Sequence, residues 1–208
     1  MSFARSERTA LCETLRSAGA DAPTLCEGWD AYTLAAHLYL RENGLAMMGN
    51  VIASRNDAVE AQLRDTKAAH SFADLVALIE SGPTGFSPFR IPGVDAGVNL
   101  VEFFIHNEDV RRAGEHPLPP RVLSDEMEGA LWSALGRSKK LFFRKAPFGV
   151  IVATPHGKSF AVGRDFEATL VGRPGELVLY SAGRTAAAEI EVKAEPLAAQ
   201  RLAASLGL

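Results

Sequence analysis

The fold of this chain is decided by the stretch Asn99-Leu-Val-Glu-Phe-Phe-Ile-His-Asn-Glu-Asp-Val-Arg-Arg112. Glu102 stands four residues before His106, and a helix turning about 100° per residue stacks these two side chains on one face. An apolar stripe at helical spacing accompanies them, made of Val98, Val101, Phe104, Ile105 and Val110. The pattern therefore predicts a helix whose Glu102 and His106 lie at or near the protein interior.

A buried carboxylate beside a buried imidazole has two interpretations, because buried charges persist when they are paired or bound to a metal. In the first, Glu102 and His106 pair with each other or cap a helical bundle. In the second, they are two arms of a divalent-metal site. A catalytic zinc site takes three N or O ligands from the protein and keeps one position open, so a third ligand has to come from elsewhere in the chain.

Composition limits the class of protein. The 208 residues are 47% hydrophobic and 23% charged, which suffices for one large or two small globular domains. The formal net charge of −3 comes without a long basic block, so nucleic acid is not an expected partner.

Several features indicate a cytoplasmic protein. The start of the chain lacks the apolar region of a signal peptide, and no apolar run approaches the roughly 20 residues of a membrane span. Cys12 and Cys26 show neither C-x-x-C spacing nor a disulfide framework, which fits a reducing compartment. We expect each cysteine to be a small buried hydrophobe rather than a nucleophile.

The N-terminal half reads as a helical bundle. An amphipathic helix is expected over residues 3–18, a Pro- and Gly-containing loop over 21–30, and a second helix over 31–48 with Asp30 as its N-cap. Further helical pieces are expected over 51–69 and 72–81, followed by an irregular loop over 83–93. His37 and Arg41 fall one turn apart on one face of the second helix. A lone histidine there is more often a hydrogen-bonded core residue than a ligand.

The C-terminal half reads as a small α+β domain. Three prolines in 114–120 suggest a stiff spacer between a domain over residues 1–115 and another over 121–208. A helix is expected over 124–143, and strands over 149–153, 159–162 and 166–170 joined by short turns predict an antiparallel meander. A short helix opened by Pro174 and stopped by Gly183, a strand over 188–192 and a last helix over 196–206 complete the domain.

Two motifs resemble a known family. The run Thr24-Leu-Cys-Glu-Gly-Trp-Asp-Ala-Tyr-Thr-Leu-Ala-Ala-His-Leu38, followed by Glu102-x-x-x-His106, is similar to the mycothiol-dependent maleylpyruvate isomerase family. The resemblance implies a DinB-like four-helix bundle in which His37, Glu102 and His106 hold a divalent metal, usually zinc. Residues 172–184 are similar to the family's smaller C-terminal domain, which is related to sterol-carrier-like α+β folds.

The resemblance also implies a chemistry. Two histidines and a glutamate leave a fourth position for water or a thiolate, and a zinc-bound thiol is deprotonated at neutral pH. A small thiol such as mycothiol, activated in this way, adds to an electrophilic substrate to isomerise it or to form a conjugate. The expected partners are this thiol and a small electrophilic substrate. The protein itself is expected to be a monomer or a weak homodimer.

An anionic substrate calls for nearby cations. The candidate catalytic residues are Arg41 and Arg184, with Arg111 and Arg112 as further candidates, although a solvated arginine is the commoner interpretation for each. Asp109 stands one turn after His106, so it either orients that histidine from behind the metal ligands or is a free surface carboxylate; the sequence favours neither. The three remaining histidines have no expected role: His70, His116 and His156.

A second hypothesis belongs to another class of function. Zinc then stabilises the bundle without catalysis, and the second domain binds an apolar ligand or a protein partner. A fourth protein ligand would favour this hypothesis, with Glu27, Cys26 or Asp109 as the nearest candidates. An open coordination position would favour the enzyme.

Overall fold

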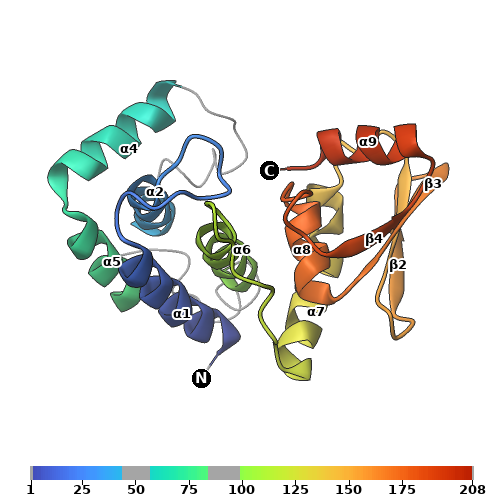
Figure 1. Cartoon of the computed structure of the whole chain (residues 1–208), viewed down its shortest axis with the longest axis horizontal. Helices are drawn as coiled ribbons and strands as arrows, with labels where there is room; N and C mark the ends of the chain where they lie inside the picture. Colours follow the sequence, from blue (N-terminus) through green and yellow to red (C-terminus); the bar gives the residue numbers. More distant parts are fainter. Residues whose placement is uncertain (1, 44–56, 84–98, 208) are drawn as a thin grey trace. The chain divides into compact units, whose positions relative to one another are not determined.

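The chain forms two compact units, Met1–Pro119 and Pro120–Leu208, shown in the computed structural model of Figure 1. The structure describes residues 2–43, 57–83 and 99–207. The parts of our helix and loop predictions that cover 44–48, 51–56 and 84–93, together with Val98, lie outside these residues.

The first unit is helical. Its elements are α1 (Phe3–Ala18), α2 (Ala31–Asn43), α4 (Asp57–Ala69), α5 (Phe72–Ser81) and α6 (Leu100–Arg111). Helix α1 packs on α5 and α6, while α2 packs on α4 and α5. The core between them is apolar and includes Leu11, Leu15, Leu34, Leu38, Leu75, Ile79 and Phe103.

Polar caps set where these helices begin. The Ser2 side chain accepts a hydrogen bond from the Arg5 backbone amide, 3.3 Å away, at the start of α1. Ser71 and Asp74 form a reciprocal capping box at the start of α5. Asp30 accepts from the Thr33 amide at 2.7 Å, in agreement with its expected role at the start of α2.

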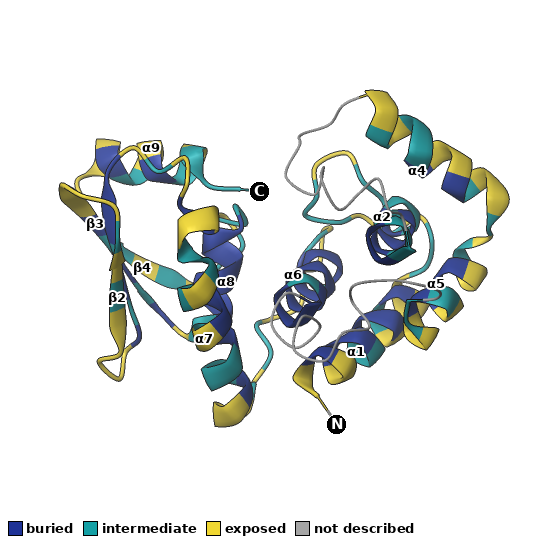
Figure 2. Cartoon of the chain, turned by 180° about the vertical axis from the view of Figure 1, so that it is seen from behind, coloured by how far each residue is buried: buried dark blue, intermediate teal, exposed yellow. Residues whose placement is uncertain are grey.

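Helix α6 is buried on nearly every side rather than along one stripe. Its buried residues include four consecutive polar ones, His106, Asn107, Glu108 and Asp109, and the helix is mostly dark blue in Figure 2. Each of these groups has a partner; for example, Thr14 Oγ1 donates to Asn107 Oδ1 at 2.8 Å. The helix of Glu102 and His106 is thus a buried element whose polar side chains are compensated one by one.

The second unit combines helices with a four-stranded mixed sheet. The strands are β1 (Gly149–Ala153), β2 (Ser159–Val162), β3 (Phe166–Gly172) and β4 (Ile190–Lys193), in the order β2-β1-β3-β4. The helices are α7 (Asp125–Phe142), α8 (Pro174–Ser181) and α9 (Pro196–Ser205). Helices α8 and α9 contact β3, and α7 packs on α8. A mainly helical chain with one small sheet is therefore confirmed at this level of detail.

The predicted antiparallel meander is wrong. Strand β1 pairs antiparallel with β2, but it pairs in parallel with β3, with Val150 opposite Ala168 and Val152 opposite Leu170. Strand β4 then pairs with β3 in the antiparallel direction, with Leu170 opposite Val192.

The short link between β2 and β3 explains the parallel pair. Residues 163–165 cross under the start of β1, where the Gly149 amide hydrogen-bonds to the Arg164 and Asp165 carbonyl oxygens. A Cβ at Gly149 would lie 2.5 Å from the Arg164 carbonyl oxygen, so a glycine is required at the crossing. Gly163 and Asp165 supply the positive φ angles, 84° and 53°, that turn the chain back on the far side of β1.

The remaining differences from the predictions are confined to element ends, where helices fray and strands stop pairing. Among the described residues, no helix is long and apolar enough to cross a membrane.

Candidate metal centre

Helices α2 and α6 bring three potential metal ligands together. His37 comes from α2, and Glu102 and His106 come from α6. Their donor atoms all lie within 4.8 Å of one another. Glu102 Oε1 is 3.4 Å from His37 Nε2 and 3.2 Å from His106 Nε2. The two imidazole rings meet edge to face, with centroids 5.4 Å apart.

These distances fit a tetrahedral ion. Zinc bonds of about 2.0–2.1 Å to N and O ligands place neighbouring ligand atoms roughly 3.3–3.4 Å apart. The separations of the Glu102 oxygen from the two Nε2 atoms, 3.4 and 3.2 Å, are close to that spacing. Hydrogen bonds from histidine to glutamate have similar lengths, so the geometry accommodates both the metal site and the paired core.

Arg41 pairs with the same carboxylate oxygen that the two histidines contact. Its Nε lies 3.2 Å from Glu102 Oε1, and its Nη1 donates to Asn99 Oδ1 at 2.5 Å. Arg41 is 2% exposed, so its guanidinium is part of the buried cluster. In this arrangement Arg41 neutralises Glu102 and restricts its rotation.

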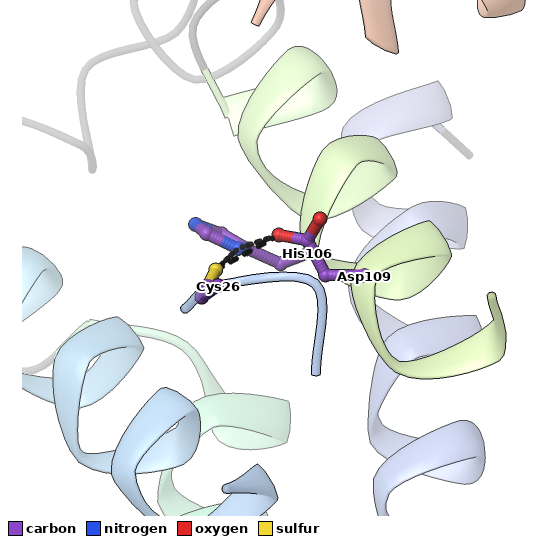
Figure 3. Close-up of side chains that lie close together, drawn as sticks. All are labelled: Cys26, His106 and Asp109. Atoms are coloured by element: carbon purple, nitrogen blue, oxygen red, sulfur yellow. Dashed lines mark hydrogen bonds and ion pairs between the residues drawn. The ribbon is translucent and has the colours of Figure 1, made fainter. Parts of the chain in front are cut away.

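Behind His106, Asp109 and Cys26 form a chain of hydrogen bonds, drawn in Figure 3. Asp109 Oδ2 lies 2.9 Å from His106 Nδ1, and Cys26 Sγ lies 3.1 Å from the same oxygen and 3.9 Å from Nδ1. The expected contact between Asp109 and His106 is therefore present. It keeps a proton on Nδ1, so Nε2 is the nitrogen that faces the ligand group and is available to a metal once it loses its proton.

The three groups in Figure 3 also form a second set of potential metal ligands. Two observations favour a hydrogen-bond chain there. The 2.9 and 3.1 Å contacts to Asp109 Oδ2 are those of an acceptor shared by two donors. A neutral imidazole also offers one lone pair, so His106 serves one set at a time.

None of the three proposed fourth ligands joins the first set. Cys26 and Asp109 lie at the Nδ1 side of His106, away from Nε2. Glu27 is exposed and belongs to neither set. Among the residues that the structure describes, the group of His37, Glu102 and His106 has three members.

A loop supports both histidines. The Trp29 ring lies 5.1 Å from the His37 ring, centroid to centroid, at a tilt of 50°. Thr24 Oγ1 braces the loop by accepting from the Cys26 amide at 3.2 Å and donating to the Trp29 carbonyl oxygen at 2.9 Å. The loop that carries the Gly-Trp motif thus packs on the ligand group.

The surroundings shift the three pKa values in different directions. Burial lowers the pKa of His37, although hydrogen bonding to Glu102 opposes the effect. Burial alone would raise the pKa of Glu102, but the charge of Arg41 and the hydrogen bonds to both histidines hold it well below its usual range. Burial would likewise lower the pKa of His106, but hydrogen bonds to Asp109, Cys26 and Glu102 raise it well above 6.5.

These directions predict the proton balance of metal binding. At neutral pH, His37 is neutral and Glu102 ionised, whereas His106 carries a proton that a metal has to displace. We expect about one proton released per ion bound, and an apparent affinity that falls about tenfold for each pH unit of acidification while His106 is protonated. Calorimetric titration of zinc in two buffers of different ionisation enthalpy measures this release. Observed binding heats that are the same in the two buffers would mean that no proton is released and would contradict the expected role of His106.

The other candidate arginines have contacts of their own. Arg111 and Arg112 both ion-pair with Glu108, at 3.4 and 2.5 Å. Arg184 belongs to the second unit, where its Nη1 donates to the Ala182 carbonyl oxygen at 2.7 Å. The histidines without an expected role are outside the ligand group: the His70 ring lies 5.2 Å from the Tyr39 ring, and His116 and His156 are exposed.

Sequence reasoning missed three supporting residues. From the sequence alone, Asn99 is only the start of the helix, without a role as a partner for Arg41. Cys26 is expected to be a core residue or a ligand, and Trp29 is only part of a motif. The loop 21–30 holds Cys26 and Trp29 close together in the sequence, which is a sign that the loop has a role. The sequence does not show which residues they contact, because Asp109 lies far from Cys26 along the chain.

Comparison with known proteins supports the fold. No protein-family model and no curated protein matches the chain. A solved structure described as the mycothiol-dependent maleylpyruvate isomerase shares 16% identity at a TM-score of 0.60, covering 92% of this chain and 90% of that one. A histidine-to-alanine mutant of the mycothiol-dependent maleylpyruvate isomerase shares 17% identity at a TM-score of 0.56, covering 93% of each chain. The resemblance seen in the sequence motifs is thus confirmed at the level of the fold.

Proposed function

We propose that this chain is a divalent-metal-dependent enzyme, a thiol transferase or isomerase, with zinc held by His37, Glu102 and His106. The observation that carries the proposal is the convergence of two Nε2 atoms on one carboxylate oxygen, at 3.4 and 3.2 Å, with no fourth His, Cys, Asp or Glu donor from the described residues. A three-ligand N/O set is the pattern of catalytic zinc sites, whereas structural sites are closed by four protein ligands.

The chain's own residues prepare this site. When bound, the metal would hold a small thiol as its thiolate. Asp109 keeps the His106 ring oriented, with Nε2 directed toward Glu102. Arg41 fixes the Glu102 carboxylate and reduces its negative charge. The Trp29 ring packs against the His37 ring at a tilt.

The fold likeness suggests the class of reactants. The two similar structures are of a mycothiol-dependent maleylpyruvate isomerase, so mycothiol is the first thiol to test and a small electrophilic carboxylate the first substrate. An anionic substrate needs a cation, for which Arg184 and Arg41 stay our candidates. Arg41 already pairs with Glu102, so its principal role in this proposal is to position the carboxylate.

The density of contacts around Glu102 favours a second candidate, a metal-stabilised module without catalysis. One Glu102 oxygen lies within 3.4 Å of both histidines and of Arg41. Such a cluster is internally satisfied, as expected for a buried structural element. The two candidates differ in whether a thiol binds at the metal.

Thiol binding therefore tests the proposal. We expect mycothiol to bind to zinc-loaded protein and to release a proton near neutral pH, because coordination lowers a thiol pKa from its usual value of about 8.5. Calorimetry in two buffers, on zinc-loaded and metal-free protein, separates binding from proton release. Equally tight binding without metal, or no binding at millimolar thiol with metal, would favour the non-catalytic module.

A further inference from the structure

Two hydrogen bonds attach the loop before α2 to Asp109 of α6. The Leu25 amide donates to the Asp109 backbone carbonyl at 3.0 Å, and the Cys26 thiol donates to Asp109 Oδ2 at 3.1 Å. The Cys26 amide is itself held by Thr24 Oγ1 at 3.2 Å. Backbone and side-chain bonds together direct the thiol at the carboxylate.

The Asp109 carboxylate depends on such donors. Asp109 is 0% exposed, and a buried carboxylate without hydrogen bonds is strongly unfavourable. Its Oδ2 accepts from Cys26 Sγ at 3.1 Å and lies 2.9 Å from His106 Nδ1. Because one oxygen serves both groups, the position of the thiol influences where that oxygen stands relative to the imidazole.

We propose that Cys26 is a positioning residue for His106, acting through Asp109. The thiol holds Asp109 Oδ2 against Nδ1, and the ring is thereby fixed with Nε2 at 3.2 Å from Glu102 Oε1. The hydrogen-bond chain exists independently of a metal, but its consequence for metal affinity rests on the proposed function. Cys26 acts here as a hydrogen-bond donor and takes no part in covalent chemistry.

Cys12 provides the comparison within the same unit. It is 0% exposed in the apolar core, its Sγ lies 3.7 Å from the Val76 carbonyl oxygen, and burial raises its pKa to about 12. Cys26 is only partly buried and donates to a carboxylate at 3.1 Å. Cys12 is thus a packing residue, and its replacement controls for the loss of a cysteine as such.

The first arm of the test uses metal-free protein. We expect Cys26→Ala to speed solvent exchange of the His106 Nδ1–H proton and of the Leu25 amide, both followed by NMR, while Cys12→Ala leaves them unchanged. Cys26→Val fills the volume of the thiol without a donor and should behave like Cys26→Ala. Cys26→Ser retains a donor and should restore slow exchange.

The second arm measures zinc affinity by competition with a chromophoric chelator. Loss of a partner behind a metal ligand typically lowers affinity 10–100-fold, and we expect Cys26→Ala and Cys26→Val to fall at the lower end of that range. Asp109→Asn should cause a larger loss. Because Cys26 acts through Asp109, adding Cys26→Ala to Asp109→Asn should lower the affinity little further.

Two outcomes would overturn the proposal: exchange and affinity in Cys26→Val equal to those of the wild type, or affinity losses of Cys26→Ala and Asp109→Asn that multiply in the double variant. If the wild-type protein binds no zinc, the proposed function fails. The exchange rates of His106 Nδ1–H and Leu25 in the metal-free protein still decide whether Cys26 positions the ring.

Discussion

Replacing His106 by Ala is expected to abolish metal retention. The wild-type protein should retain about one divalent ion through purification, and its zinc content should fall to background in His106→Ala and in His37→Ala. Both variants remove a proposed direct ligand, so the loss should exceed the 10–100-fold effect of changes behind the ligands. Elemental analysis of the purified proteins measures the result. Nickel and copper compete for such a site by intrinsic affinity, so purification has to avoid both metals.

His70→Ala is the matched control. The His70 ring packs against Tyr39 and belongs to neither group of potential ligands among the described residues. Its loss should leave the zinc content unchanged. Full metal content in His106→Ala would remove the proposed site from consideration.

Replacing Arg41 by Met is expected to destabilise the metal-free protein strongly. Arg41 is 2% exposed and pairs at 3.2 Å with the half-buried carboxylate of Glu102, so its removal leaves that carboxylate partly uncompensated. Breaking a buried ion pair in this way typically lowers the free energy of unfolding by about 3–5 kcal/mol. Zinc then supplies the missing positive charge, so the rise in Tm on adding zinc should be larger in Arg41→Met than in the wild type. Thermal unfolding with and without zinc gives both quantities.

Arg8→Met separates this effect from general destabilisation. Arg8 forms another buried ion pair of the first unit, with Glu42, and also donates to the Ile79 carbonyl oxygen at 2.7 Å. Its loss should lower the Tm comparably while leaving the zinc-induced rise at its wild-type value. An equal zinc-induced rise in the two variants would show that Arg41 does not neutralise a metal ligand.

Local sequence patterns predict two members of the ligand group, Glu102 and His106, but not the third, His37. The four-residue spacing places Glu102 and His106 on one face of α6, and their 3.2 Å contact follows from helix geometry. His37 lies 65 residues before Glu102, so no local periodicity connects it to α6. Only the family resemblance predicts that His37 is a metal ligand, and this role stays a prediction until metal is measured.

Other features lay beyond local patterns. The turn signals between the strands show where β1, β2 and β3 end, but not on which side of β1 the third strand adds. The third strand can add on that side because Gly149 has no side chain to clash with the Arg164 carbonyl oxygen. This is a contact between two separate segments, so a local sequence pattern does not reveal it. Likewise, the Cys26 thiol meets Asp109 only because the loop folds back on α6.

Cobalt substitution tests the central claim most directly, because Co²⁺ takes the place of zinc and reports its own ligands. We predict that Co²⁺-loaded protein shows the visible bands of a four-coordinate N/O site, and that mycothiol adds a thiolate-to-cobalt charge-transfer band in the near ultraviolet. The His106→Ala protein should show neither. A cobalt spectrum that mycothiol does not change at millimolar concentration would contradict an open, thiol-binding metal site.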